Sequence, residues 1–493
     1  SAKDLQAYIS RLSQIAPYLL TQLDDVQSAA QAGVRAPKFA YDTVIRQTRG
    51  FITGAPFDDN GDSPLWANAN GKIDDLLRNG AITEREAREQ RDAVRSLLLD
   101  SFGPAYAEVL SWFEGDRPLA SADPCGALSM EDGNAYYAER LRYYTTTNMS
   151  AAEIHQLGLQ EVARIHGEIR ALMEEVNFEG DLKAFFNYIR DDESFYYPST
   201  DEGRQAFKDE TQFYLDRINK RLPEYFGVLP KAGLEVRRVE AFRERDGAAA
   251  FYQQGTPDGS RPGAYYMHLS DMGANNRSDL QTTAYHEGNP GHHMQVSIAL
   301  ERDDLPLFRS DVWYSGYGEG WALYAEQVAF EMGVYDNPYY NVGRLVSEVF
   351  RAIRLVVDTG IHALGWSEEQ AVQYMLDNSA VPEASARSEI RRYIVWPGQA
   401  TAYKIGMLKI LELRRYAQTM LGDQFSIRDF HDLVLAGGSL PLEILENRVQ
   451  QWVSSQQQFD ATVRRGPYGV AHIKADDYAS LGYGEGYAAA EDH

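Results

Sequence analysis

Residues 286–293 read His-Glu-Gly-Asn-Pro-Gly-His-His, and this stretch holds the densest group of potential metal ligands in the chain. It places His286, Glu287, His292 and His293 close together, although the chain has only 10 histidines. In many zinc hydrolases one helix carries two histidine ligands four residues apart, and the glutamate beside the first histidine activates water. The stretch therefore predicts a metal site, but its second histidine comes later than that spacing requires.

An uninterrupted helix could not bring two of these imidazoles to one ion. Each residue turns a helix by about 100°, so His292 would lie about 240° around from His286. His293 returns to within about 20° of His286 but lies about 10.5 Å further along the axis, whereas zinc–nitrogen distances are about 2.0 to 2.1 Å. Because Pro290 interrupts helical hydrogen bonding, we predict a break in which Asn289 and Pro290 loop out. This arrangement makes His286 and His292 the expected ligands, with His293 as the alternative.

A third protein ligand is expected on a neighbouring helix, with the fourth position left open. Residues 315–326 read SGYGEGWALYAE, in which Glu319 and Glu326 are separated by about two helical turns and share one face. An unpaired carboxylate would be costly to bury in such an aromatic segment. Both glutamates are therefore candidates for the third ligand.

Three longer stretches, HEGNPGHHMQ, GYGEGWALYAEQ and RRYIVWPGQATAYKIG, together resemble the bacterial family called domain of unknown function 885, whose members are often regarded as lipoproteins. The resemblance runs from the segment TNMSAAEIHQLGLQEVARIHGEI to about residue 470. That family in turn resembles the helical zinc peptidases typified by angiotensin-converting enzyme, thimet oligopeptidase and carboxypeptidase Taq. The resemblance implies a mainly α, large helical fold with a deep cleft and a small β-sheet beside the metal helix. It also implies Glu319 as the third ligand and one zinc ion per chain.

Together these features predict a zinc-dependent peptide hydrolase, either an oligopeptidase or a carboxypeptidase or dipeptidase. Glu287 would act as the general base toward a metal-activated water. Tyr403 is the first candidate for the donor to the developing oxyanion, because a phenol donates a hydrogen bond without carrying charge, and Tyr393 is the second. The residues expected to contact substrate are Tyr393, Gln399, Lys404 and His268.

Several basic residues could bind the carboxylate of a peptide substrate, namely Arg387, Arg391, Arg392 and Lys404. The same residues could equally pair with the chain's own acids, which number 72. A basic group that captures a C-terminal carboxylate would make the protein a carboxypeptidase or dipeptidase. The sequence does not decide between these possibilities.

Helical patterns dominate the chain. Ser150-Ala-Ala-Glu153 is a capping box ahead of an amphipathic run to about residue 175. Similar patterns recur over residues 80–114, 201–221, 341–364 and 400–421. Strand patterns are confined to about residues 233–270, where Gly263–Leu269 could pair with an extended peptide along the cleft. We therefore predict a helical scaffold over residues 1–120, a catalytic region over 121–470 and an irregular C-terminal extension over 471–493.

The composition excludes some classes of partner. The formal net charge of −24 argues against nucleic-acid binding, which needs clustered basic residues. No segment approaches the roughly 18 to 20 apolar residues of a membrane helix, and the first residues, SAKDLQAYISRL, do not resemble a signal peptide. Cys125 is the single cysteine, so no internal disulfide is possible. Because the resembled family includes lipoproteins, we expect an exported protein, periplasmic or held by a lipid anchor on a longer precursor, with a cytoplasmic location as the alternative.

Two other interpretations stay open on the sequence. One is a catalytically idle, metal-containing protein that binds peptides or small molecules. The other is a hydrolase of a non-peptide amide or ester, which could use the same ion, base and oxyanion donor. The presence of Glu287 favours an enzyme, although such a carboxylate could also serve only to orient an imidazole.

Overall fold

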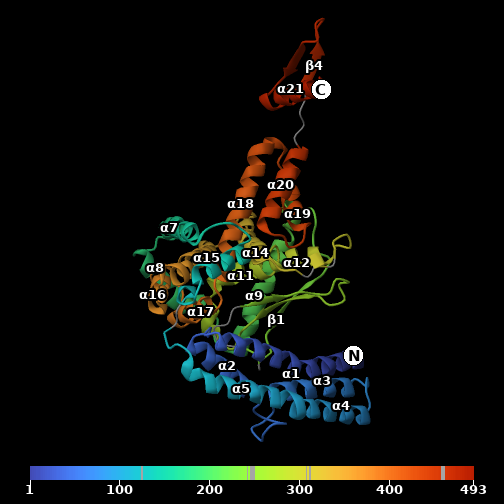
Figure 1. Ribbon diagram of the computed structural model, residues 1–493, viewed down its shortest axis with the longest axis vertical. Helices are drawn as coiled ribbons and strands as arrows, with labels where there is room; N and C mark the ends of the chain where they lie inside the picture. Colours follow the sequence, from blue (N-terminus) through green and yellow to red (C-terminus); the bar gives the residue numbers. More distant parts are fainter. Residues whose placement is uncertain are drawn as a thin grey trace.

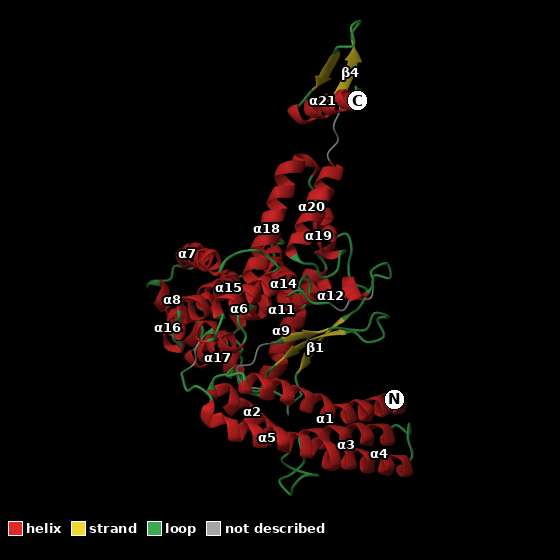
Figure 2. Ribbon diagram, viewed as in Figure 1, coloured by secondary structure: helices red, strands yellow, loops and turns green. Residues whose placement is uncertain are grey.

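The computed structural model describes residues 1–123, 126–240, 243–244, 250–306, 308–309, 312–456 and 461–492. Within these residues the chain is mainly helical and carries two small sheets (Figure 2). This confirms the predicted mainly α fold with a small sheet. Among the described helices, none has the length and apolar character that crossing a membrane requires. Cys125 lies outside the described residues.

The N-terminal helices form a layer along one end of the molecule (Figure 1). They are α1 (Ala2–Gln31), α2 (Lys38–Phe51), α3 (Pro64–Arg78), α4 (Glu84–Leu97) and α5 (Gly103–Asp116). This layer has an apolar cluster of its own, built from buried side chains such as Leu5, Ile73, Val94 and Phe102. The predicted N-terminal scaffold therefore has a structural counterpart, whereas its boundary at residue 120 stays a prediction.

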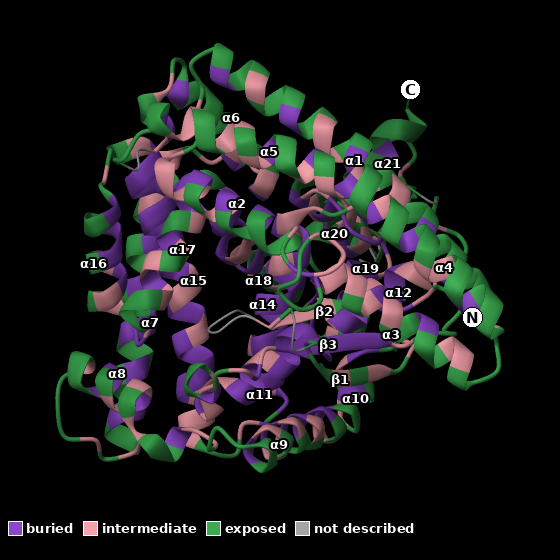
Figure 3. Cartoon of the chain, turned by 90° about the horizontal axis from the view of Figure 1, so that it is seen from below, coloured by how far each residue is buried: buried purple, intermediate pink, exposed green. Residues whose placement is uncertain are grey.

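The central body contains the remaining α-helices that the structure describes up to residue 456. They are α6 (Gly133–Thr145), α7 (Ala151–Glu175), α8 (Leu182–Asp191), α9 (Asp201–Asn219), α10 (Leu222–Tyr225), α11 (Arg277–Glu287), α12 (His292–Leu300), α14 (Ser315–Glu331), α15 (Pro338–Leu364), α16 (Glu368–Asn378), α17 (Glu383–Val395), α18 (Ala402–Leu421), α19 (Ile427–Leu435) and α20 (Leu442–Gln456). Helix α15 packs against both α7 and α11, and α14 packs against α18. The buried faces of these helices form the main core (Figure 3).

Helices α14 and α18 approach each other at backbone distance. A Cβ atom added to Gly406 would lie 1.8 Å from the carbonyl oxygen of Gly316, and one added to Gly320 would lie 2.5 Å from Gly406. Only glycine permits such an approach, because any side chain would overlap the partner backbone. The contact fixes the spacing between the helix that carries Glu319 and the helix that carries Tyr403.

A three-stranded sheet lies beside α11 and α12, as the resemblance implied (Figures 2 and 3). Its central strand β3 (Gly263–Met267) is fully buried and pairs in parallel with β1 (Leu234–Arg238) and antiparallel with β2 (Phe251–Gln253). Strand β2 is therefore an edge of this sheet. The predicted strand region over 233–270 is confirmed within the described residues.

The C-terminal segment is ordered secondary structure, which corrects the predicted irregular extension over 471–493. Strands β4 (Ala461–Arg465) and β5 (Ala471–Ala475) form a hairpin, and α21 (Tyr478–Glu491) follows (Figure 1). Val463 pairs with Ile473, and Ile473 packs against Gly484 of the helix. The prediction followed the glycine- and tyrosine-rich composition of this segment, and the alternation of inward and outward side chains in its short strands was not recognised.

Candidate metal centre

A four-residue turn, residues 288–291, separates α11 from α12 and provides the predicted helix break. The backbone N–H of Gly291 donates a 2.9 Å hydrogen bond back to the last turn of α11. The indole N–H of Trp321 donates to the carbonyl oxygen of Pro290 at 2.9 Å and holds the turn from α14. A Cβ atom on Gly291 would lie 2.0 Å from the carbonyl oxygen of His286, so the tight return of the chain requires glycine here.

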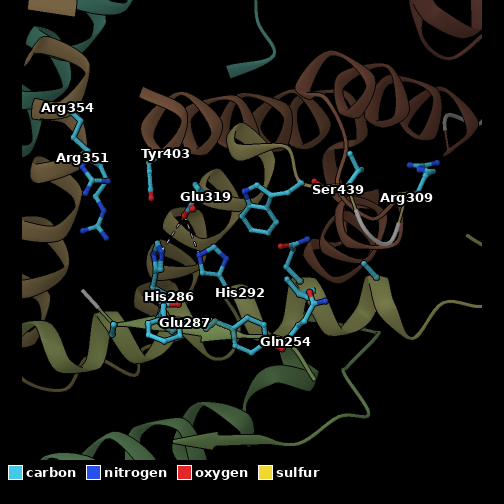
Figure 4. A pocket seen from close by; sticks show the side chains of 18 residues that line it. Gln254, His286, Glu287, His292, Arg309, Glu319, Arg351, Arg354, Tyr403 and Ser439 are labelled. Atoms are coloured by element: carbon cyan, nitrogen blue, oxygen red, sulfur yellow. Dashed lines mark ion pairs between the residues drawn. The ribbon is translucent and has the colours of Figure 1, made fainter. Parts of the chain in front are cut away.

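The turn brings the side chains of His286 and His292 together with that of Glu319 from α14. One donor atom from each of the three lies within 4.8 Å of the others (Figure 4). The carboxylate oxygen Oε2 of Glu319 is 3.3 Å from Nε2 of His292 and 3.9 Å from Nε2 of His286. The two imidazole rings are perpendicular, with centroids 4.8 Å apart. Two nitrogens and one carboxylate oxygen therefore converge on one point.

Glu326 holds His286 from the side opposite the converging atoms. Its Oε1 is 2.8 Å from Nδ1 of His286, and its Oε2 accepts a 2.9 Å hydrogen bond from the hydroxyl of Ser347. Ser347 in turn accepts a 2.7 Å hydrogen bond from Arg351. This chain assigns the Nδ1 proton to His286 and leaves its Nε2 lone pair directed at the cluster. The sequence predicted that Glu319 and Glu326 share one face of a helix. In the structure, Glu319 lies beside Nε2 of His292, whereas Glu326 contacts Nδ1 of His286.

The three residues fit a divalent transition-metal ion. Two imidazole nitrogens and one carboxylate are a common donor set for zinc, with a further position left for water or substrate. A carboxylate behind the first histidine is the usual orienting partner of a metal-bound imidazole. Nδ1 of His292 is buried and has no hydrogen-bond partner among the described residues.

The electrostatics of the cluster match the roles of its members. Burial lowers the pKa of His286 well below its ordinary value, so this imidazole is neutral and able to donate a lone pair. Burial also disfavours the charged form of His292, but the Glu319 carboxylate outweighs it and raises the pKa of His292 overall. Burial opposes ionisation of Glu319 as well, but the hydrogen bond and charge of His292, together with the charges of His286 and Arg354, outweigh burial and lower the pKa of Glu319. Glu319 is thus an anion facing two imidazoles.

Glu287 is the last residue of α11 and faces the same cavity as the cluster (Figure 4). Its side chain is buried, and burial raises its pKa to about 7, against the opposing charge of His292. A carboxyl group with a pKa in this range can both accept and return a proton near neutrality.

His293, the alternative ligand, points away from the cluster. Its Nε2 is 3.1 Å from the carbonyl oxygen of Ala232, and its Nδ1 is 3.2 Å from the hydroxyl of Tyr252 and 3.3 Å from that of Ser297. Burial lowers the pKa of His293 to about 4. With both ring nitrogens engaged elsewhere, the geometry favours His292 over His293.

A cavity of about 500 Å³ opens onto the cluster. It is bordered by Phe251 and Tyr252 of the edge strand β2, and by Trp313 ahead of α14. The side chain of Tyr403, from α18, reaches into it beside Glu319 (Figure 4). Burial raises the pKa of Tyr403, and the nearby Glu319 charge adds to the effect, so its phenol stays protonated and able to donate.

A second hollow of about 360 Å³ adjoins the cluster and is also lined by His286 and Glu287. His268, which follows β3, lines this second hollow, and its ring centroid is 6.1 Å from that of Phe251. The predicted substrate contact at His268 therefore lies beside the site, in the smaller of the two spaces. Both spaces are also lined by Arg351 and Arg354 of α15.

Three further predicted contacts lie outside the larger cavity. Tyr393 is fully buried, donates a 2.7 Å hydrogen bond to Glu389 and so does not reach the reacting region. Gln399 is buried and accepts a 2.8 Å hydrogen bond from Arg392. Lys404 is fully buried, 2.6 Å from a carboxylate oxygen of Glu348. The structure thus places Lys404 in an internal ion pair, where it has no access to substrate.

The basic residues proposed for carboxylate binding are engaged by the chain's own glutamates. Arg387 pairs with Glu368 and Glu369, Arg391 pairs with Glu368, and Arg392 pairs with Glu389. Sequence reasoning missed Arg351 and Arg354, which do line the site. The only indication of their role in the sequence was a weak one, namely two arginines three residues apart within the otherwise apolar run FRAIRLVV.

The family comparison covers most of the chain. Residues 1–449 match the family described as bacterial protein of unknown function (DUF885), and the chain belongs to this family. A crystal structure of a candidate lipoprotein from Colwellia psychrerythraea is similar, with a TM-score of 0.86, 32% identity, and coverage of 92% of this chain and 77% of the other. A candidate lipoprotein of unknown function from Shewanella oneidensis shares the fold, with a TM-score of 0.64, 19% identity, and coverage of 90% and 78%.

The C-terminal hairpin and helix match a different family. Residues 460–493 match the penicillin amidase family. A stretch of 35 residues is 57% identical to aculeacin-A acylase of Actinoplanes utahensis, which is 7% of this chain and 4% of the length of that acylase. Among the residues of this segment that the structure describes, none lines the cavity at the candidate metal centre.

Proposed function

We propose that this chain is a zinc-dependent hydrolase of peptide bonds. The observation that carries the proposal is the convergence of His286, His292 and Glu319 at the wall of a cavity, with the buried carboxyl group of Glu287 facing the same space. The proposed relation to helical zinc peptidases, in which a glutamate on the next helix completes the ligand set, rests on the same arrangement. This chain differs from those peptidases in the longer interval between its two histidine ligands.

His286, His292 and Glu319 would hold the ion. A bound divalent cation supplies Lewis acidity, which lowers the pKa of water and polarises a carbonyl group. Glu287 takes a proton from the attacking water and passes it to the nitrogen of the leaving amine, which its pKa of about 7 suits. The Tyr403 phenol donates a hydrogen bond to the oxygen on which negative charge develops.

The edge strand β2 supports a peptide as the substrate. Phe251 and Tyr252 of this strand border the cavity, and β2 has no further neighbour in its sheet among the described residues. An extended peptide could pair with the free edge of β2 and run past the cluster, because backbone groups of an edge strand are available for such pairing.

Hydrolysis of a non-peptide amide is the second candidate. It is favoured by the match of residues 460–493 to the penicillin amidase family and by the similarity to an acylase. The match is confined to β4, β5 and α21, which contribute nothing to the cavity. A peptide amide is therefore the better-supported substrate. By similarity to candidate lipoproteins, we also propose that the protein is exported and carries a lipid anchor.

Metal content tests the proposal directly. We expect one zinc per chain by mass spectrometry, lost in His292→Ala and Glu319→Ala and kept in the matched control His293→Ala. Glu287→Gln should keep the metal and lose cleavage of a peptide library, because it removes the proton acceptor and leaves the ligands in place. Absence of metal from wild-type protein incubated with zinc would refute the ligand assignment. Full cleavage by Glu287→Gln would refute the proposed base.

A further inference from the structure

We propose that Arg351 and Arg354 bind a carboxylate of the substrate. The preferred substrates would then be peptides and N-acyl amino acids whose scissile amide lies one residue from a free C-terminal carboxylate. This inference rests on the proposed hydrolase function and specifies the substrate class of that site.

The two arginines lie next to the candidate metal centre. They project from α15, three residues apart, and both line the 500 Å³ cavity and the 360 Å³ hollow. Figure 4 shows them to one side of Glu319, whereas Arg309 and Ser439 lie at the other end of the cavity. The arginine pair therefore marks a short arm of the substrate space, and the rest of the cavity forms a longer one.

Arg354, which lines this short arm, has one donor atom without a partner among the described residues. Its side chain is 8% exposed, and its Nε donates to the Tyr393 hydroxyl at 2.9 Å and its Nη2 to Glu389 at 3.1 Å. Its Nη1 is buried without a hydrogen-bond partner among the described residues. Leaving a buried charged donor unpaired is costly, so an acceptor on a bound ligand that reached this group would be stabilised.

Arg351 supplies a second such donor. Its Nη1 donates to the hydroxyl of Ser347 at 2.7 Å, and its Nε is buried without a partner in the described part of the chain. Glu389 pairs with both Arg354 and Arg392, and neither of these ion pairs involves Arg351. The result is a pair of arginines at the wall of both spaces, each with one buried donor that has no partner among the described residues.

A carboxylate fits these donors better than a neutral group. Guanidinium and carboxylate groups form short charge-assisted hydrogen bonds in planar, directed geometry. In a peptide, the terminal main-chain carboxylate always belongs to the part that leaves as the amine. One residue spans about 3.8 Å, so a carboxylate held in the short arm would place the preceding amide next to the cluster. The longer arm, bordered by β2, would then bind the part of the substrate on the carbonyl side of the scissile amide.

The test compares two substrates that differ in one group. An N-acyl dipeptide with a free C-terminal carboxylate and the same dipeptide as its C-terminal amide are assayed with zinc-loaded protein. We expect the wild type to favour the acid by about tenfold to a hundredfold in kcat/KM, the range for hydrogen bonds to a charged group. Arg351→Gln should bring this ratio close to one. Arg391→Gln, whose side chain pairs with Glu368 at the surface, should keep the wild-type ratio and serves as the matched control.

The possible outcomes separate this inference from the proposed function. Equal cleavage of acid and amide by the wild type would overturn the carboxylate site while leaving the hydrolase in place. An equal loss for both substrates in Arg351→Gln would also overturn it, because the arginine would then act on the reacting carbonyl. Absence of bound zinc and of all cleavage would refute the hydrolase itself. The acid-to-amide ratio of the wild type decides the inference even if a variant fails to fold, and zinc content reports whether each variant retains its site.

Discussion

The substitution Gly406→Ala tests whether the close contact between α14 and α18 is needed for both stability and site geometry. A Cβ atom at this position would lie 1.8 Å from the carbonyl oxygen of Gly316 and 2.7 Å from Cα of Gly320. Both neighbouring atoms belong to the backbone, so no side chain can rotate away to relieve the overlap. The helices must therefore move apart.

The required displacement sets the expected magnitude. Ordinary contacts of a Cβ atom begin near 3.4 Å, so 1.8 Å leaves a shortfall of about 1.6 Å. Overpacking of a core typically costs about 1 to 3 kcal/mol, and we expect about 3 kcal/mol here, because two backbones must separate. Tyr403 lies three residues before Gly406 on α18, and Glu319 lies on α14. A misplacement of about 1 Å between catalytic groups can lower a rate about a hundredfold, so peptide cleavage should fall by a similar factor.

Urea denaturation followed by circular dichroism measures the loss of stability. Gly167→Ala is the matched control, because Gly167 is an exposed residue inside α7 and a Cβ atom there would contact nothing within 4 Å. Alanine has the higher helix propensity, so this control should gain about 0.5 to 1 kcal/mol. If Gly406→Ala were as stable as the wild type, or gained stability as the control does, the argument from close backbone packing would be refuted.

Three further predictions follow from other contacts. Glu326→Gln removes the negative charge that orients His286 and should weaken zinc affinity by about tenfold to a hundredfold in chelator competition, whereas Glu331→Gln on the same helix should not. Burial lowers the pKa of His431 to about 3, so its contribution to stability is complete above about pH 6.5 and is lost as the pH falls toward 3. Between pH 7 and pH 5, the free energy of unfolding should thus fall by about 2 kcal/mol less in His431→Asn than in the wild type. If urea denaturation gave the same dependence of this free energy on pH for both proteins, the prediction would be wrong. Lys404→Met should destabilise the protein by about 3 kcal/mol, because its buried acidic partners lose compensation, whereas unchanged stability with a raised KM would indicate substrate contact instead.

Local rules were sufficient to predict the helix break and the two histidines beside it, whereas Glu319 was assigned from the family resemblance. The position of Pro290, together with the angle and rise of a helix, was enough to favour His292 over His293. The helical segments and the strand region were likewise visible as periodic patterns. These features depend on residues that are neighbours in sequence, so their geometry follows from backbone constraints alone.

The remaining features depend on contacts between distant segments. Lys404 pairs with Glu348 and Glu161, which come from two other helices, so its burial could not be inferred from its own surroundings in sequence. Arg351 and Arg354 belong to a largely apolar helix, and only the packing of α15 directs them to the site. Such pairings are set by tertiary structure, which a single sequence does not reveal.

The turn between α11 and α12 has a consequence for how related sites are found. It gives each histidine its own helix, so their separation along the chain is set by the length of a loop and is independent of the helical repeat. A genome search for two histidines four residues apart would pass over this chain, although its imidazoles face one carboxylate in space. Any insertion that returns the chain to the same point could preserve such a site, so searches for distant relatives should allow the interval between the two histidines to vary.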